Sequence, residues 1–255
     1  MALLETKDLT KRFGGLAAVN VVTMQVNKGE ILGLVGPNGA GKTTLFNLIS
    51  GFFRPTRGKI VFKGDDVTGL KPNQIAERGI ARTFQASNLF KTRTVWENVL
   101  IACHLQFHTG FLKVLLNTPF ARSEEKEMRQ KALNLIESMG LSEVKNEFAV
   151  NLPHGHQRML GVCLALAANP ELLLLDEPVA GLSVEETLAF MHRVKELRDK
   201  GITILLVEHN MRAVMGTCDR IAVLNYGKKI AEGSPGEIRE NKDVIEAYLG
   251  EAIEI

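Results

Sequence analysis

The sequence predicts an α/β fold, and two apolar runs with the helices around them carry that prediction. ELLLLDEP (171–178) and ITILLVEH (202–209) are continuously apolar, as in strands buried on both faces of a parallel sheet. Helical patterns flank them, with HQRMLGVCLALAANP before the first run and VEETLAFMHRVKELRDKG between the two. Strands that alternate with helices are typical of an α/β core.

The first part of the chain has a different pattern. Residues 3–30 mix short β-like runs with turn residues at Gly14-Gly15 and around Gly29, which predicts an antiparallel, sheet-rich segment. ILGLVG (31–36) is a short apolar strand, and TTLFNLISG (43–51) is a helix that Gly51 ends. GKIVFKGDDV (58–67) returns to strand, with a turn expected at Gly64-Asp65.

A mainly helical block from about 88 to 150 interrupts the α/β pattern, and we interpret it as an inserted subdomain. Within it, Ser123 is the expected N-cap of a helix that extends to Gly140. The chain is expected to end in a hairpin (221–233) and a helix (243–252). We therefore expect a single domain, 1–255, whose parts are 1–87, 88–150 and 151–255.

Composition excludes several classes of protein. Hydrophobic residues make up 45% and charged residues 24% of 255 residues, an ordinary globular balance. The net charge of +2 does not favour nucleic acid as a partner. Polar residues interrupt the most apolar candidate span, Val99–Leu116, so any membrane role is expected to be through a membrane partner. The three cysteines lack metal-type spacing and no signal peptide is recognised, which indicates core thiols in a cytoplasmic protein.

The strongest motif is GPNGAGKTT, which fits G-x-x-x-x-G-K-[ST] between an expected strand and an expected helix. Its glycines allow the backbone to wrap phosphates, and the helix N-terminus adds a positive dipole end. Lys42 can reach the β- and γ-phosphates, and the Thr43 hydroxyl can bind Mg²⁺. The expected nucleotide-binding residues are Gly36, Pro37, Asn38, Gly39, Ala40, Gly41, Lys42, Thr43 and Thr44.

Two further motifs follow the buried strands. Asp176 and Glu177 end LLLLDEP, where open α/β sheets bind ligands. Asp176 can join a Mg²⁺ shell and Glu177 can act as a base on water; two solvated loop acids are the alternative. His209 ends the next strand and can reach the same pocket, although a structural histidine is equally consistent with the pattern.

These motifs, with Gln85 in ARTFQ and with LPHGHQR, resemble the nucleotide-binding subunit of an ABC transporter. KRFGGLAAVN, NQIAERGIARTFQ and GSPGEIRENKDVIEAYLGEA are similar to the branched-chain amino acid importer ATPases, the LivG type. The resemblance implies a P-loop NTPase (RecA-like) core with an N-terminal antiparallel β subdomain and an inserted helical subdomain. It also implies ATP and Mg²⁺ as cofactors and a second ATPase subunit and a permease as partners. The subunit would lie at the cytoplasmic face of the membrane, peripheral through the permease.

The resemblance also implies roles for single residues. Phe13 would stack on adenine, and Gln85 would sense Mg²⁺ and the attacking water. Asp176 would serve Mg²⁺, Glu177 would be the catalytic base and His209 would contact the γ-phosphate. Residues 180–186, AGLSVEE, would communicate across a dimer, with Ser183 where many relatives have aspartate.

One stretch departs from the family pattern of leucine, serine, glycine, glycine and glutamine, which acts in trans on the partner's nucleotide. We call it the signature segment; it consists of Leu152, Pro153, His154, Gly155, His156 and Gln157. Pro153 suits the first turn of a helix but has neither a hydroxyl nor an amide hydrogen to donate to phosphate. His154 and His156 either replace a donor or are solvated, and no third ligand for a metal is evident.

The sequence therefore predicts the ATPase subunit of an ABC importer, with branched-chain amino acids as the expected cargo and a heterodimer favoured over a homodimer. The alternatives are the ATPase of another ABC transporter, such as a lipid or polysaccharide exporter, and a nucleotide-binding regulatory subunit with little turnover. A soluble factor acting on ribosomes or DNA is less consistent, because such proteins usually have two ATPase units or a long inserted arm.

Overall fold

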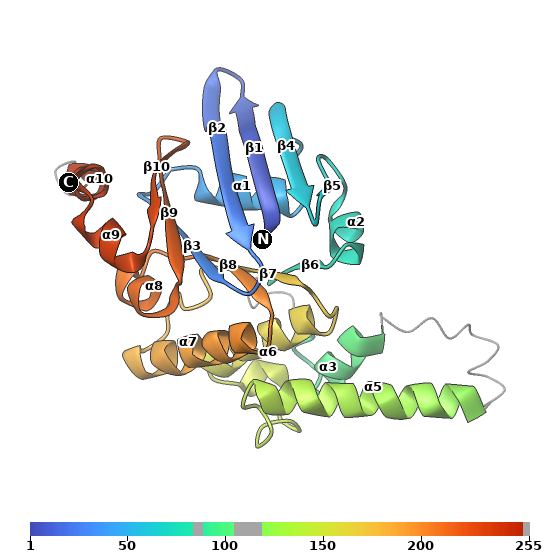
Figure 1. The fold of residues 1–255 in the computed structure, drawn as a ribbon. Helices are drawn as coiled ribbons and strands as arrows, with labels where there is room; N and C mark the ends of the chain where they lie inside the picture. The colour runs from blue at the N-terminus through green and yellow to red at the C-terminus, as the bar shows by residue number, and fades with distance from the viewer. Residues whose placement is uncertain (84–88, 105–118, 252–255) are drawn as a thin grey trace. The chain divides into compact units, whose positions relative to one another are not determined.

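The computed structural model describes residues 1–83, 89–104 and 119–251 (Figure 1). Contacts divide the chain into two units. The first unit consists of Met1–Arg82, Glu171–Ala180 and Val194–Ile255. The second consists of Thr83–Pro170 and Gly181–Arg193.

A six-stranded sheet forms the centre of the first unit, in the order β10-β9-β3-β8-β7-β6. Its strands are β3 (Ile31–Val35), β6 (Ile80–Arg82), β7 (Leu172–Asp176), β8 (Thr203–Val207), β9 (Arg220–Asn225) and β10 (Lys228–Gly233). All neighbours are parallel except β10, which pairs antiparallel with β9. Every residue of β3 and β8 is buried, as expected of central strands covered on both faces. The predicted α/β fold is confirmed.

An antiparallel sheet in the order β2-β1-β4-β5 lies in the same unit. Its strands are β1 (Ala2–Phe13), β2 (Leu16–Asn27), β4 (Arg57–Phe62) and β5 (Asp65–Asp66). The turn between β4 and β5 is at Lys63-Gly64 and not at Gly64-Asp65 as expected. Both residues have positive φ, 55° and 86°, and this pair of left-handed residues matches the twist of a two-residue hairpin.

Helix α1 (Lys42–Ile49) lies between the two sheets of the first unit. Its buried face includes Leu45 and Phe46, which share one core cluster with Leu4 of the antiparallel sheet and Leu205 of the parallel sheet (Figure 1). Gly51 follows the helix with φ 78°, the C-terminal stop that the sequence predicted. The other helices wholly within this unit are α2 (Pro72–Glu77), α8 (Met211–Thr217), α9 (Pro235–Glu240) and α10 (Lys242–Glu251).

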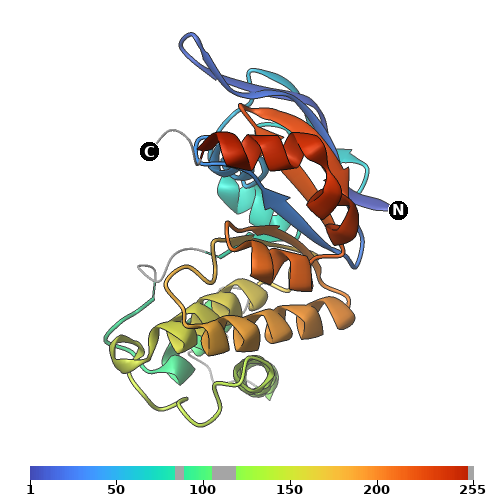
Figure 2. The same ribbon diagram turned by 90° about the vertical axis from the view of Figure 1, so that its left-hand side faces the viewer.

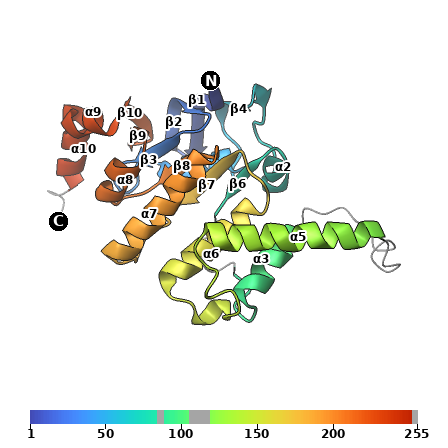
Figure 3. The ribbon, with the colours of Figure 1, turned by 60° about the horizontal axis from the view of Figure 1, so that its bottom comes forward.

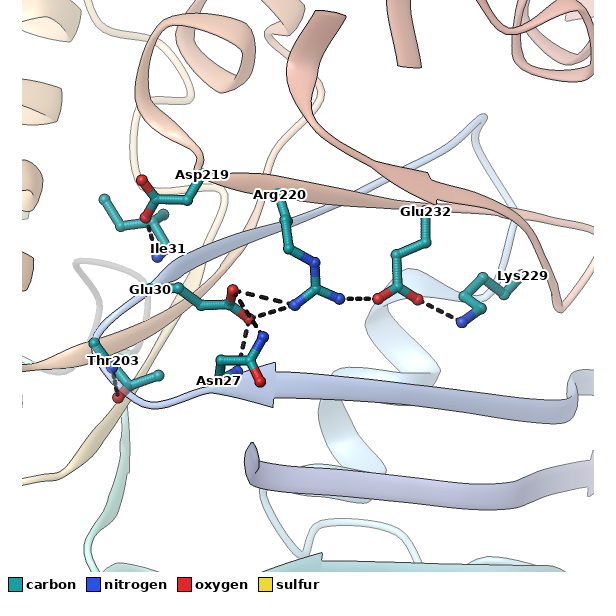
Figure 4. Close-up of polar contacts among 9 residues, drawn as sticks. Asn27, Glu30, Ile31, Thr203, Asp219, Arg220, Lys229 and Glu232 are labelled. Carbon is teal, nitrogen blue, oxygen red and sulfur yellow. Dashed lines mark hydrogen bonds and ion pairs between the residues drawn. The ribbon is translucent and has the colours of Figure 1, made fainter. Parts of the chain in front are cut away.

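A chain of charged side chains anchors the C-terminal hairpin (Figure 4). Arg220 on β9 donates to both carboxylate oxygens of Glu30, at 2.8 and 3.1 Å, and also bonds Glu232 on β10. Glu30 accepts from the amide of Asn27 at 2.6 Å, and Lys229 bonds Glu232. These bonded side chains therefore join the turn before β3 to the C-terminal hairpin. Helices α9 and α10, drawn in red in Figure 2, lie beside this hairpin.

The second unit is helical. It contains α3 (Val95–His104), α5 (Pro119–Ser138), a short 3-10 turn (Ala149–Asn151), α6 (His154–Leu166) and the first part of α7 (Val184–Asp199). Helix α5 contacts both α3 and α6 (Figure 3). It begins at Pro119, so Ser123 lies inside the helix and is not its N-cap; the residues before it belong to the segment outside the described range.

Asn98, which is fully buried on α3, organises the loop that precedes that helix. Its side-chain amide donates to the carbonyls of Phe90, Arg93 and Thr94. Residues 91–96 in turn exchange backbone hydrogen bonds with residues 145–150. This pairing holds the backbone that leads into the signature segment.

All three cysteines, Cys103, Cys163 and Cys218, are buried and free, which confirms their predicted place in the core. Among the described residues, no helix is long and apolar enough to cross a bilayer. Of the candidate span Val99–Leu116, all residues after His104 lie outside the described range.

Candidate functional site

The strand order brings three chain segments to one edge of the parallel sheet. Strand β8 lies between β3 and β7, and Val207 at its end pairs with Leu34 on one side and Asp176 on the other. Residues 36–41, which we call the phosphate loop, follow β3, Glu177 follows β7, and His209 comes two residues after the end of β8. All three segments belong to the first unit and meet where parallel sheets place their ligand sites.

Close backbone approaches shape the phosphate loop. A Cβ at Gly36 would lie 2.1 Å from the carbonyl oxygen of Leu224, and one at Gly41 would lie 2.2 Å from that of Ala18. Any side chain at these positions would push the loop away from β9 or β2. Gly227, in the β9–β10 turn, completes the packing, since its amide donates to the carbonyl of Ala40 at 3.0 Å.

Helix α1 begins directly after this loop without a side-chain cap. Its N-cap is Gly41, with φ 100°, and its first turn contains no acidic residue. The first amides of a helix have no partner within the helix, so such an end favours an anion. The Lys42 ammonium is buried and donates to the carbonyls of Gly36 and Pro37 at 2.6 and 2.8 Å. A positive charge is thereby held inside the loop.

Glu177 has a left-handed backbone with φ 45°, which is uncommon for a residue other than glycine. Its amide donates to the carbonyl of Val207 at 2.9 Å, which fixes the turn after β7. The Glu177 carboxylate is 42% exposed, and its Oε1 lies 3.9 Å from Nδ1 of His209. Backbone strain of this kind concentrates at functional sites because the surrounding structure must stabilise it.

Arg82, at the end of β6, is a site residue that sequence reasoning missed. Its Nη2 donates to Oδ2 of Asp176 at 2.8 Å, and its Nη1 donates to Asn47 on α1 and to Ser50, the C-cap of that helix. The guanidinium also lies over the ring of Phe46. Arg82 therefore joins the carboxylate at the end of β7 to the helix that follows the phosphate loop. Its place at a strand end was the available signal, but its partner is 94 positions away.

Glu208 is a second residue that the sequence reasoning passed over. Its side chain is fully buried, and its two oxygens accept from the amides of Val179, His209 and Asn210. Burial raises the pKa of the Glu208 carboxyl, with the backbone donors opposing the shift. The residue joins the segment after β7 to the segment after β8. An acid directly after a buried strand was its signal, the same one that marked Asp176 and Glu177.

This raised pKa predicts how stability depends on pH. Because the folded-state pKa of Glu208 lies above its unfolded value, its stabilising contribution is complete below the unfolded pKa and is lost as pH rises through the folded one. The difference in unfolding free energy between wild type and Glu208→Gln should therefore fall from about pH 4.5 upward. Urea unfolding at a series of pH values measures it, with exposed Glu240→Gln as the control. A difference that stays constant or rises with pH contradicts the prediction.

Phe13 lies at the end of β1 and is 45% exposed. It meets Phe53 edge to face, with ring centroids 5.5 Å apart, and the Lys11 ammonium lies 5.1 Å from its ring centre. The ring is thus partly supported and still accessible to a flat ligand. Gln85 lies outside the described residues.

The signature segment lies in the second unit. Leu152 is buried, and Pro153 is the N-cap of α6, which begins at His154. Gln157 folds back, and its Nε2 donates to the Leu152 carbonyl at 2.9 Å. His154 is exposed, whereas the buried Nδ1 of His156 has no hydrogen-bond partner among the described residues. The N-cap supplies no side-chain hydrogen bond to the helix.

A cavity of about 650 Å³ borders the phosphate loop. Residues 37–40, the turn Asn225-Tyr226 and helix α10 line it. Helix α10 contributes the carboxylates of Asp243 and Glu246, so the cavity is electrostatically unsuited to phosphate. The anion-favouring end of α1 remains the site to which the geometry points.

The donor set is suited to Mg²⁺ only together with a ligand. Asp176 and Thr43 supply oxygen atoms, but among the described residues no group of three His, Cys, Asp or Glu side chains gathers as a metal site. In proteins, Mg²⁺ is usually bound by one or two carboxylates, and waters and substrate phosphates complete its coordination shell. A site of this kind needs the phosphates to complete it, which fits the residues present.

A glycine-lined helix N-terminus at the same sheet edge as the acids at the end of β7 has the parts that phosphoryl transfer requires. Fold and site together define a P-loop nucleoside triphosphatase. The chain belongs to the ABC transporter family, whose model, described as ABC transporter, matches residues 19–180. It is an ABC-type ATPase. A second model, described as branched-chain amino acid ATP-binding cassette transporter, matches residues 228–254.

Known proteins agree with this assignment. The chain is 48% identical over 251 residues to the high-affinity branched-chain amino acid transport ATP-binding protein LivG of Salmonella typhimurium, covering 98% of each. The ADP conformation of MJ1267, an ATP-binding cassette of an ABC transporter, has a TM-score of 0.86 and 33% identity, covering 98% and 99% of the two chains. The dimeric post-hydrolysis state of MJ0796, bound to ADP and Pi, has a TM-score of 0.75 and 25% identity, covering 91% and 98%.

Proposed function

We propose that this chain is the ATP-hydrolysing subunit of an importer for branched-chain amino acids, bound to the cytoplasmic face of the membrane through its permease. The observation that carries the cargo class is the C-terminal segment 228–254, which matches the branched-chain transporter model. Its described part, 228–251, folds as β10, α9 and α10 and is anchored through Arg220 and Glu232. Identity to LivG along almost the whole chain supports the same cargo.

The proposed ATPase chemistry assigns one task to each group. The loop amides and Lys42 bind the phosphates, and Phe13 stacks on adenine. Glu177 accepts a proton from the attacking water. His209, whose Nδ1 lies 3.9 Å from Oε1 of Glu177, contacts the γ-phosphate. Thr43 and Asp176, with Gln85, would hold Mg²⁺, which would supply neutralisation of the developing phosphate charge. Arg82 holds the carboxylate of Asp176 in place.

The cargo is tested by identifying the permease. Full-length chain isolated from native membranes should bring with it a permease and a second ATPase subunit. In proteoliposomes, that complex should take up labelled leucine, isoleucine or valine with ATP hydrolysis. Co-purification with a lipid or polysaccharide exporter, or uptake of none of the three amino acids, rejects the proposed cargo while leaving the ATPase intact.

We also propose that residues 88–150 form the inserted helical subdomain of one ABC ATPase domain, and that this domain pairs with a different ATPase subunit. In such a pair, one composite site uses Lys42 and Glu177 of this chain with the partner's signature. The other uses only this chain's signature segment, in which Pro153 has no amide hydrogen and the α6 N-cap has no side-chain bond. Donors to transition-state charge contribute roughly 10²–10³ in rate, so the second site is expected to be slow.

Repairing the signature segment should therefore raise activity only where it limits turnover. Pro153→Ser combined with His154→Gly should raise the ATPase rate of the isolated protein and change that of the complex by at most about twofold, since its other site dominates. Steady-state phosphate release from wild type and double variant, each alone and with the partner, measures this. If isolated wild type already equals the complex per site, the two sites are not asymmetric and the histidines are adequate donors.

A further inference from the structure

The carboxylate of Glu186 joins the starts of two helices in the second unit. On its own helix, α7, its Oε2 accepts from the Ser183 amide at 2.9 Å, while its amide donates to the Ser183 hydroxyl at 3.1 Å. This reciprocal pair is a capping box. Its other oxygen faces α6, since a Cβ at residue 155 would lie 2.9 Å from Oε1. The Gly155 amide, close to this carboxylate, is among the groups that lower the pKa of Glu186.

Glu186 supplies the N-terminus of α6 with a negative charge that the residues of α6 itself do not provide. Pro153, its N-cap, makes no side-chain cap bond, and the first turn contains no acidic residue. Glu186 supplies negative charge there from another element, as a helix N-terminus favours. The Ser183 amide, then the Gly155 amide, the Ser183 hydroxyl and the charge of His154 hold the pKa of Glu186 below its usual range. Glu186 is therefore ionised at neutral pH.

We propose that Glu186 is a positioning residue that controls when the signature segment can bind phosphate, holding the Gly155 amide until ATP in the partner subunit displaces it. The inference rests on the proposed function, in which the signature segment faces the partner's nucleotide. An amide has one hydrogen, so it bonds well to either the carboxylate or a phosphate. The two anions also repel at such short range, so docking of the phosphate requires the carboxylate to move away.

Glutamine at position 186 separates this role from a purely structural one. Glutamine also serves at the third residue of a capping box, so Glu186→Gln retains the cap of α7 and removes only the charge. Hydrogen bonds to neutral groups are weaker than those to charged groups, so the Gly155 amide becomes easier to displace. Glu186→Ala removes both the cap and the charge, so its stability loss relative to Glu186→Gln measures the cap.

The first experiment observes the Gly155 amide directly in the full-length protein. His154-Gly155 is the single histidine–glycine pair in the sequence. Labelling with ¹³C-carbonyl histidine and ¹⁵N-glycine therefore leaves one cross-peak in a carbonyl-filtered amide spectrum. Glu186→Gln should move that proton upfield, while the matched Glu185→Gln, which removes a charge from the same turn of α7, should not. An unmoved peak, or equal shifts in both variants, overturns the proposed contact.

The second experiment measures the competition with ATP in the complex of full-length chain and partner. In a complex whose other site is silenced by Glu177→Gln in this chain, Glu186→Gln should lower the KM for ATP at the site that uses this signature segment roughly three- to tenfold, with kcat within about twofold. In a parallel series, the partner's own catalytic glutamate is replaced by glutamine, so that MgATP-driven association is measured without turnover. Glu186→Gln should lower the MgATP concentration needed for this association by the same factor. Exposed Glu143→Gln is the control for lost charge.

The possible results separate the inference from the function on which it rests. An unchanged or raised KM in Glu186→Gln, with normal association of wild type, overturns the role of Glu186 and leaves the ATPase assignment. Failure of wild type to associate or turn over with MgATP and any co-purifying subunit overturns the proposed function itself, and the positioning role with it.

Discussion

Glu177→Gln is expected to retain MgATP binding and to slow ATP hydrolysis by the assembled transporter roughly 10²–10⁴-fold, as loss of a general base does. The glutamate lies at the end of β7, with its backbone strained and its amide bonded to Val207. Glutamine keeps the size and the turn but cannot take a proton from water. Its neighbour His209, whose Nδ1 lies 3.9 Å from the Glu177 carboxylate and which we propose contacts the γ-phosphate, is unchanged in this variant.

The measurement is single-turnover phosphate release, with nucleotide affinity determined separately by calorimetry. Glu171→Gln is the control, since Glu171 lies just before the opposite end of β7 and is paired with Lys63. It should leave the rate near that of wild type. If Glu177→Gln turns over at the wild-type rate, the residue is not the base, and the strained turn requires another explanation.

Lys42→Ala is expected to weaken MgATP binding on the order of 10²-fold or more, because it removes the positive charge held inside the phosphate loop. Two hydrogen bonds to charged groups are worth about 1.5–3 kcal/mol each, which reaches this magnitude. The ammonium also bonds the carbonyls of Gly36 and Pro37, so the loop itself loses two contacts.

Calorimetry at moderate salt gives the affinity, and thermal unfolding shows whether the loop's loss of contacts has disturbed the fold. Lys42→Arg keeps the charge in a larger group and separates loss of charge from loss of fit: it should retain the fold and recover part of the affinity. Near-normal affinity in folded Lys42→Ala removes the lysine from phosphate binding.

The sequence predicted most successfully those features that depend on residues close together in the chain. The phosphate loop needs glycines, a lysine and a helix start within nine residues, so GPNGAGKTT was sufficient to predict it. Buried parallel strands are recognisable because both faces are covered, which makes ELLLLDEP and ITILLVEH continuously apolar. Errors arose where the evidence was one residue wide, as at Ser123, which lies inside α5, and at the Lys63-Gly64 turn.

Tertiary structure alone decided which distant groups meet, because side-chain partners depend on strand order and register. Strand β8 lies between β3 and β7, and this order brings His209 to Glu177. Pairing of β6 with β7 brings Arg82 to Asp176, 94 positions away. Glu186 and Gly155 meet because the starts of α7 and α6 lie close together in the second unit. The sequence shows each of these charged residues but not the residue with which it pairs. Folding decides the pairs, because burial makes an unpaired charge costly.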